Sequence, residues 1–211
     1  MIENCEKYFY SIKDKQTFEI KVKRSLFICS LKFVETTIEA KEFISKISQK
    51  HRNATHNCWA YILGDKGETS HCSDAGEPSG TAGKPMLNAL KSYETANIAA
   101  VVTRYFGGVK LGIKGLINAY SESVKMTLEQ GTLIKLIKTE LVRIVTEYSF
   151  NDTLAYKLAK YPGTIINIEY SDMVIYDFEV EQKHALKLES YLSGFQNSGI
   201  LKYTKIDRGN L

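Results

Sequence analysis

The segment 96–115 combines residue types that suit the binding of an anion. Its continuous apolar run, Ile98–Val102, is typical of a strand buried on both faces. The loop Arg104–Gly112 follows, with three glycines and two cations and without an acidic residue. Apolar residues that include Ile113 and Ile117 then predict the inward face of a helix. Because a glycine loop between a strand and a helix directs backbone N–H groups at an anion, we predict a phosphate-binding site here.

A second glycine loop, residues 68–85, leads into another predicted helix. It is rich in Gly, Ser and Thr, and its length favours a functional role. Pro85 suits the first position of a helix that runs to about Tyr93. Neither loop matches the phosphate-loop or dinucleotide-binding patterns, but together they predict one groove. We assign its anion-binding side to Lys84, Arg104, Gly107, Gly108, Lys110 and Gly112, and its other wall to His56, Asp74 and Glu77.

The two acids of the second loop allow two interpretations. Asp74 and Glu77 could hold a magnesium ion that bridges to a bound phosphate, because hard cations prefer oxygen ligands. They could instead pair with Arg104 or Lys110 and order an empty site, which requires no cofactor and is the interpretation that we favour. Together with His56, these acids are also the candidate acid–base residues of an enzyme.

Histidine and cysteine side chains offer two further kinds of chemistry. His56, Cys58, His71 and Cys72 are potential zinc ligands, but none of the usual finger spacings is present. A cysteine paired with a histidine could act as a nucleophile, yet the chain has no catalytic cysteine signature and no serine nucleophile elbow. A buried cysteine beside a polar histidine is the simpler interpretation. We therefore predict no resident metal and no cofactor.

Alternating patterns predict the strands that position these residues. Residues 1–16 are polar and irregular, so we expect a loose lead-in there. Strands are predicted at about 18–22 and 25–34. A further strand is predicted at 56–63, where the period of two places His56, Cys58 and Ala60 on one face and Trp59 and Tyr61 on the other.

A capping box predicts the first helix. Thr36 and Glu39 have the required spacing, and the helix should run to about Gln49. Its apolar face is predicted to contain Ile38, Phe43, Ile44 and Ile47.

The pattern changes near residue 135, where we place a domain boundary between residues 1–135 and 136–211. A strand is predicted over 136–150, and Asn151 or Asp152 then caps a short helix. A hairpin, a second helix and a last strand follow. The order β-α-β-β-α-β is that of the ferredoxin-like unit.

Length and composition limit the class of protein. The 211 residues suffice for one or two domains, and 44% hydrophobic with 25% charged residues is ordinary for a soluble globular protein. We expect no membrane span and no signal peptide, hence a cytoplasmic protein whose four cysteines are reduced. Residues 1–130 hold 18 Lys and Arg against 14 Asp and Glu, whereas residues 131–211 hold ten of each. The surplus of positive charge in residues 1–130 is compatible with a polyanion partner for that part of the chain.

Three segments resemble the motifs of the YigZ/IMPACT family. They are His56–Tyr61, Asp74–Pro85 and Arg104–Gly112. The resemblance covers about residues 17–130, and the remainder is similar to the small C-terminal domain of the bacterial YigZ branch. It implies an α+β protein with two domains. The first is of the ribosomal-protein type with a left-handed βαβ element, and the second is ferredoxin-like, similar to the last domain of elongation factor G.

The resemblance also bears on function, because the eukaryotic members of the family are translational regulators that act through protein contacts. We expect a translation-associated protein that binds RNA, the ribosome or a nucleotide through the glycine-rich basic groove. The first alternative is an enzyme that acts on a small phosphorylated or nucleotide substrate, with His56, Asp74 and Glu77 as acid–base residues. The second alternative is a protein-interaction module with a protein partner in translation control. An absence of catalysis is the expectation that we favour.

Overall fold

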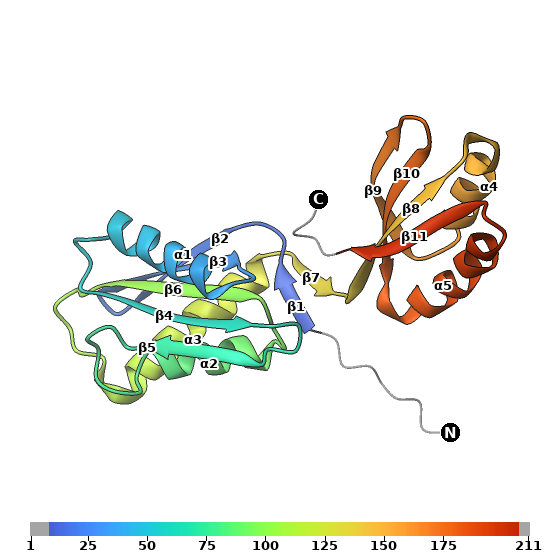
Figure 1. Ribbon diagram of the computed structural model, residues 1–211. Helices are drawn as coiled ribbons and strands as arrows, with labels where there is room; N and C mark the ends of the chain where they lie inside the picture. The colour runs from blue at the N-terminus through green and yellow to red at the C-terminus, as the bar shows by residue number, and fades with distance from the viewer. Residues whose placement is uncertain (1–8, 207–211) are drawn as a thin grey trace, which may run out of the picture. The chain divides into compact units, whose positions relative to one another are not determined.

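In the computed structural model, which describes residues 9–206, the chain forms two units that divide between Leu136 and Ile137. The first unit is built on a five-stranded sheet with the order β2-β3-β6-β4-β5, in which every neighbouring pair is antiparallel. Figure 1 shows helix α1 on one face of this sheet and helices α2 and α3 on the other. The elements are β2 (Gln16–Val22), β3 (Ser25–Phe33), α1 (Thr37–Lys50), β4 (His56–Leu63), β5 (Thr69–Ser73), α2 (Gly83–Ser92), β6 (Ile98–Tyr105) and α3 (Gly112–Gln130).

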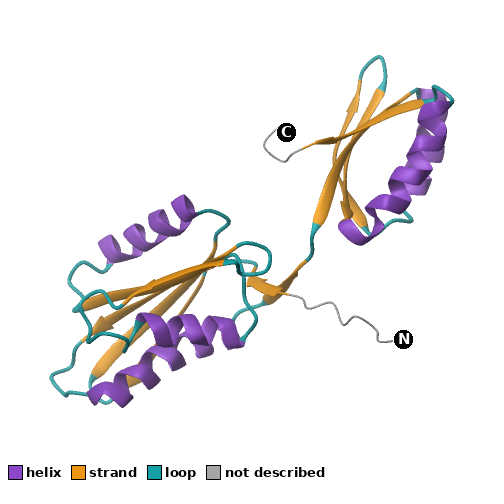
Figure 2. Cartoon of the chain, turned by 60° about the horizontal axis from the view of Figure 1, so that its bottom comes forward, coloured by secondary structure: helices purple, strands orange, loops and turns teal. Residues whose placement is uncertain are grey.

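The two crossover connections in this sheet are of opposite hand. β3 and β4 are both antiparallel to β6, so they run parallel to each other, and α1 lies in their connection. In the same way β5 and β6 run parallel on either side of β4, with α2 in their connection. We view each connection with its two strands pointing upward and with the same face of the sheet toward the viewer. Both connections then move two strands in the same direction, but α1 and α2 cover opposite faces of the sheet (Figure 2). One of them is therefore left-handed, an uncommon arrangement that agrees with the fold implied by the family resemblance.

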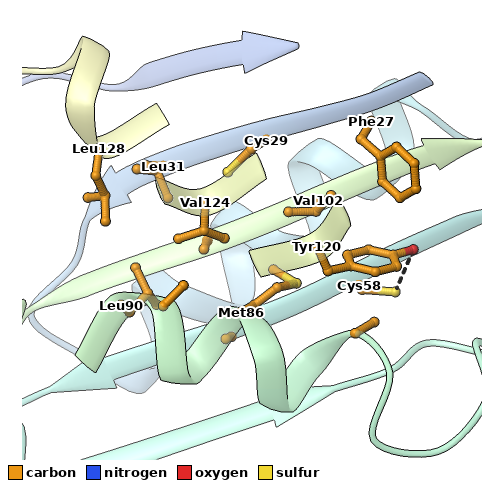
Figure 3. Close-up of a cluster of buried hydrophobic side chains, with 14 of the residues drawn as sticks. Phe27, Cys29, Leu31, Cys58, Met86, Leu90, Val102, Tyr120, Val124 and Leu128 are labelled. Carbon is orange, nitrogen blue, oxygen red and sulfur yellow. Dashed lines mark hydrogen bonds between the residues drawn. The ribbon is translucent and has the colours of Figure 1, made fainter. Parts of the chain in front are cut away.

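The sheet separates two apolar layers. The side chains of one face pack with α2 and α3, and Figure 3 shows this layer, which includes Phe27, Cys58 and Tyr120. The other face packs with α1 and includes Tyr61 and Trp59. The period of two in β4 thus produces the two faces predicted from the sequence.

The second unit is a four-stranded antiparallel sheet with two helices, in the order β11-β8-β10-β9. This strand order and the sequence of elements are those of the ferredoxin-like unit. Its core is formed by the sheet and the inward faces of the two helices. The elements are β8 (Thr139–Thr146), α4 (Tyr148–Leu158), β9 (Gly163–Tyr170), β10 (Val174–Glu181), α5 (Gln182–Asn197) and β11 (Leu201–Ile206).

Two predicted segments differ from the structure. Of the predicted lead-in, residues 1–8 lie outside the described residues. Strand β1 (Phe9–Ile12) pairs with β7 (Leu133–Leu136), and Ile12 is fully buried. The strand predicted over 136–150 is interrupted at residues 137–138 and ends before a helix that begins at Tyr148. No glycine or proline marks these breaks, so the pattern alone did not reveal them.

Three isoleucines predicted to face inward are exposed, namely Ile38, Ile113 and Ile117. Ile38 and Ile113 lie in the first turns of α1 and α3, and the buried positions of α3 begin only at Leu116. Ile38 and Ile113 therefore precede the part of each helix that packs on the sheet, whereas Ile117 follows Leu116 and is 36% exposed.

Candidate functional site

The topology brings both glycine loops to one end of the first unit's sheet. β5 and β6 end there and β3 and β4 begin there, because β6 is antiparallel to both β3 and β4. Helices α2 and α3 follow β5 and β6 and run back along the sheet, so both helices begin at this end. His56 begins β4, and its Nδ1 lies 3.0 Å from the carbonyl oxygen of Ala75 in the second loop.

Strand register sets a row of three side chains across this end. Phe27 stands opposite Arg104, and Arg104 stands opposite His56. Residues directly opposite each other in a sheet share a face, so all three lie on the face that carries α2 and α3. The first loop leaves this row at Phe106, whose backbone N–H donates to Thr55 Oγ1 at 3.0 Å.

Arg104 is buried and paired. Its Nη1 donates to Glu77 Oε1 at 2.6 Å, with 7% and 3% of the two side chains exposed. Tyr120 donates to the same oxygen at 2.9 Å. The guanidinium carbon lies 5.5 Å from the ring centre of Phe27 and 5.3 Å from that of Phe106. The structure thus forms the ion pair that we favoured for Glu77, and the charge of Arg104 is already neutralised.

Asp74 occupies the N-terminus of α2. Its Oδ1 accepts from the backbone N–H groups of Ala82 at 2.9 Å and Gly83 at 2.8 Å, and its Oδ2 accepts from Gly80 at 2.8 Å. Partial burial acts to raise the pKa of Asp74, but the three hydrogen bonds outweigh it and lower that pKa. The protein's own carboxylate therefore takes the place that an external anion would have at this helix, and Asp74 pairs with backbone rather than with Lys110.

His56 faces Glu77 across a gap. A carbonyl oxygen can only accept, so the hydrogen bond to Ala75 assigns the proton to His56 Nδ1 and leaves Nε2 unprotonated in the neutral ring. That Nε2 lies 4.0 Å from Glu77 Oε2. The His56 side chain is 20% exposed, whereas that of Glu77 is 3% exposed.

Cys58 is unsuited to nucleophilic chemistry. Burial raises the pKa of its thiol to about 12, with smaller contributions from its polar neighbours. Its sulfur lies 2.9 Å from the carbonyl oxygen of Asp74 and 3.4 Å from the Tyr120 hydroxyl, the contact drawn in Figure 3. Because the thiolate is the reactive form, the arrangement indicates a structural thiol.

The four potential zinc ligands do not converge. His71 stands opposite Tyr61 and Cys72 opposite Ala60, which places these neighbours on opposite faces of the sheet. Among residues 9–206, no group of three or more His, Cys, Asp or Glu side chains is placed to hold a metal ion.

The start of α3 differs from that of α2. No side chain caps it. Gly107 lets the loop before it pass close to the turn between β2 and β3, because a Cβ there would clash with the carbonyl group of Arg24. Lys23 Nζ, from the same turn, donates to the Lys110 carbonyl oxygen at 3.4 Å. We call this region the basic end, after four exposed cations, Lys23, Arg24, Lys110 and Lys114.

The remaining predicted residues are distributed as follows. Lys84 is exposed on the first turn of α2. Gly108 and Gly112 adopt positive φ values of 82° and 73°, and a Cβ at either would meet open space. Phe106 is 45% exposed.

A model of the Impact N-terminal domain matches residues 23–128, half of the chain, and spans every residue of this site. The chain belongs to the IMPACT family. The family member YvyE of Bacillus subtilis (strain 168) is 39% identical over 192 residues, which cover 90% of this chain and 87% of YvyE. The family member YigZ of Escherichia coli (strain K12) is 32% identical over 184 residues, which cover 85% of this chain and 89% of YigZ.

A solved structure is also similar to this IMPACT-family chain. It is a crystal structure described as that of a hypothetical protein, with 30% identity and a TM-score of 0.66. The match covers 95% of this chain and 98% of that one. The similarity therefore extends over both units.

The three segments that carried the resemblance to the IMPACT family all reach this end of the sheet. Sequence reasoning missed two residues that complete it, Tyr120 and Thr55. Tyr120 lies on the apolar face of α3, and its hydroxyl donates to Glu77. A tyrosine on an apolar stripe is a signal worth following, because a buried hydroxyl requires a partner.

No helix among the described residues is both long enough and apolar enough to span a membrane.

Proposed function

We propose that this protein regulates translation and that it binds phosphate groups of RNA, of the ribosome or of a nucleotide at the basic end. The observation that supports the proposal is the start of α3. Its first turn has no side-chain cap, and exposed Lys110 and Lys114 flank it. Free backbone N–H groups beside cations form a suitable environment for a phosphate.

The glycines would allow a close approach. Gly108 and Gly112 leave open space where a side chain would stand, so a phosphate oxygen can reach the backbone between the two lysines. Gly107 acts differently, because its missing Cβ lets the loop pass close to Arg24 and keeps the cations together. Lys84 adds an exposed cation from α2.

Arg104 has a positioning role in this proposal. Its charge is balanced by Glu77, and its guanidinium lies against the ring of Phe106. The half-exposed ring is thereby held beside the lysines, where a base of single-stranded RNA could stack on it.

The translational part of the proposal rests on family membership. The eukaryotic proteins that the sequence resembles regulate translation, and phosphate binding at the basic end would suit contact with RNA.

The test is the binding of a labelled single-stranded RNA of about 12 nucleotides, measured by fluorescence anisotropy at about 50 and about 200 mM salt. We expect binding that weakens as salt rises. Lys110→Ala should weaken it several-fold and reduce the salt slope by about one. Lys202→Ala, which removes an exposed lysine of the second unit, is the matched control.

Equal affinities for the wild type and for a variant that lacks both Lys110 and Lys114 would overturn the proposal. A nucleotide that competes with RNA and raises the melting temperature would narrow the ligand to a nucleotide.

One observation favours the enzyme as a second candidate. His56 Nε2 lies 4.0 Å from Glu77 Oε2, and 20% of the histidine side chain is exposed against 3% of the glutamate side chain. Under this alternative His56, supported by Glu77, could exchange a proton with a phosphorylated substrate. Under this alternative, His56→Gln abolishes product formation and preserves substrate affinity, whereas the binding protein that we propose shows no turnover before or after the change.

A second observation favours the protein-interaction module. A groove of about 420 Å³ lies between β2, an edge strand, and α3. Its lining residues include Ile20, Val22, Gly115, Asn118 and Ala119. A free strand edge beside a groove can receive an extended peptide. Under this alternative, a protein partner is lost on Asn118→Trp, while RNA affinity is unchanged.

A further inference from the structure

The core face of the second unit's sheet continues past its helices onto β9. This strand lies at the edge of the sheet, and within residues 9–206 it pairs with β10 alone (Figure 1). Tyr170, Ile168 and Ile165 stand opposite Val174, Tyr176 and Phe178, respectively. Because opposite residues share a face, these three β9 side chains lie on the side that carries α4 and α5.

The helices leave this part of the face uncovered. The β10 partners Val174, Tyr176 and Phe178 are at most 2% exposed, whereas Ile165, Ile168 and Tyr170 are 37%, 38% and 61% exposed. Contiguous exposed apolar surface marks an interaction site. The β9 patch, as we define it, consists of Ile165, Ile166, Ile168 and Tyr170 together with exposed Tyr148, whose ring centre lies 6.4 Å from that of Tyr170.

The free edge of β9 has one charged residue and no proline to protect it against pairing. An edge strand presents unpaired backbone N–H and C=O groups, which natural proteins shield with charges or prolines. β9 has the sequence GTIINIEY, with Glu169 as its one charged residue. The register shifts at Asp177 and Phe178, which bends the strand without adding a charge to it.

Charges along this edge are arranged for pairing with a copy of itself. α4 runs antiparallel to β9, so its N-terminal end lies beside the C-terminal end of the strand. Acidic residues gather there, namely Glu147, Asp152 and Asp172, and Lys160 lies at the other end. Glu169 stands opposite Ile175 and therefore lies on the other face of the sheet, and Lys157 is directed at α5, with its Nζ 4.5 Å from the ring centre of Tyr191.

We propose that β9 pairs with β9 of a second copy of this chain in an antiparallel, two-fold symmetric dimer. Antiparallel pairing places the acidic end of each strand beside the basic end of the other. The two β9 patches meet on one face of a continuous sheet of four strands from each copy. A self-complementary surface of this kind is the usual basis of a symmetric dimer. The dimer does not depend on the proposed function, since β9 belongs to the second unit.

The experiment is sedimentation velocity on the full chain, from about 1 to about 200 µM. We expect a concentration-dependent species of twice 23.9 kDa. Ile168→Arg should raise the dissociation constant at least about tenfold, because it places a charge in the centre of the β9 patch. Leu186→Arg is the matched control, since Leu186 is an exposed apolar residue of α5 outside the patch, and it should leave the dimer intact.

A charge exchange tests whether the occupant is a second copy. Lys160→Glu and Asp172→Lys should each weaken the dimer, and the double variant should restore it, because the opposed charges are exchanged in both copies. A chain that remains monomeric over the whole range overturns the proposal. So does a dimer that is equally stable in Ile168→Arg, since it must use another surface. Circular dichroism of Ile168→Arg verifies that the variant is folded.

Discussion

The N-termini of α2 and α3 lie at the same end of one sheet, and each follows a glycine loop, but they are completed in different ways. At α2 the carboxylate of Asp74 accepts three backbone hydrogen bonds. At α3 no side chain caps the first turn, and lysines stand around it. A glycine loop before a helix therefore prepares a place for an anion but does not determine whether the protein or a ligand supplies it. At α2 the nearby carboxylate of Asp74 supplies the anion. The loop before α3 contains no acidic residue, so under our proposal a ligand supplies the anion there.

The largest expected effect concerns the ion pair between Arg104 and Glu77, the latter in the loop that leads to α2. Arg104→Met leaves Glu77 as a buried charge without its main partner, so the free energy of unfolding should fall by about 4 kcal/mol. Urea unfolding measures this. The double variant Arg104→Met with Glu77→Leu should recover part of the loss. If the double variant were less stable than the single one, the buried pair would not be the reason for the effect.

The second prediction removes the internal anion. Asp74→Ala deletes three charge-assisted hydrogen bonds and a favourable interaction with the helix dipole, so unfolding should become easier by about 2 kcal/mol. Urea unfolding at neutral pH measures the change. Lys110→Ala, just before the uncapped start of α3, is the matched variant. It should change the free energy of unfolding by less than about 0.5 kcal/mol.

The same carboxylate makes stability depend on pH. The pKa of Asp74 is lowered from its usual 3.8 in the folded protein, so the folded state binds its proton less readily than the unfolded state. Its contribution is therefore complete above pH 3.8 and is lost as the pH falls through the lowered folded-state pKa. Asp74→Ala should flatten this part of the stability curve. An unchanged acid limb would show that other carboxylates determine it.

A small effect on stability is expected when the start of α3 is given its own acid. Lys110→Asp places a carboxylate just before α3, so it should change the free energy of unfolding by no more than about 1 kcal/mol, in the stabilising direction. RNA affinity should nevertheless fall further than in Lys110→Ala, because the added charge repels phosphate. Anisotropy and urea unfolding on the same samples measure both. If Lys110→Asp left RNA affinity unchanged, the start of α3 would not be the phosphate site that distinguishes it from the start of α2.

Local patterns were sufficient to predict much of the fold. The alternation in β4 gave both faces of the sheet, because a strand between two apolar layers must alternate. The capping box gave the start of α1, where the backbone N–H of Glu39 donates to Thr36 Oγ1 at 3.2 Å. The order of elements gave the ferredoxin-like unit. By contrast, the left-handed crossover came from the family resemblance, because no local pattern encodes the side on which a helix crosses.

The site was predictable in its parts but not in its pairings. The glycine spacing indicated both loops. Which acid paired with which cation depended on β6 lying between β3 and β4, and this arrangement sets Arg104 in the same row as His56 and Phe27. The sequence therefore allowed Asp74 and Glu77 the same role, whereas the structure makes one a helix cap and the other the partner of a buried arginine.

The central position of β6 also has a consequence for biosynthesis. β6 joins the β2–β3 pair to the β4–β5 pair, and it is the last strand of this sheet to leave the ribosome. Until Ile98–Tyr105 has emerged, the nascent chain has two hairpins and no strand to connect them. We therefore expect the first unit to fold late and in one step, after a delay set by translation itself, because pairing distant strands is the slow part of assembling a sheet.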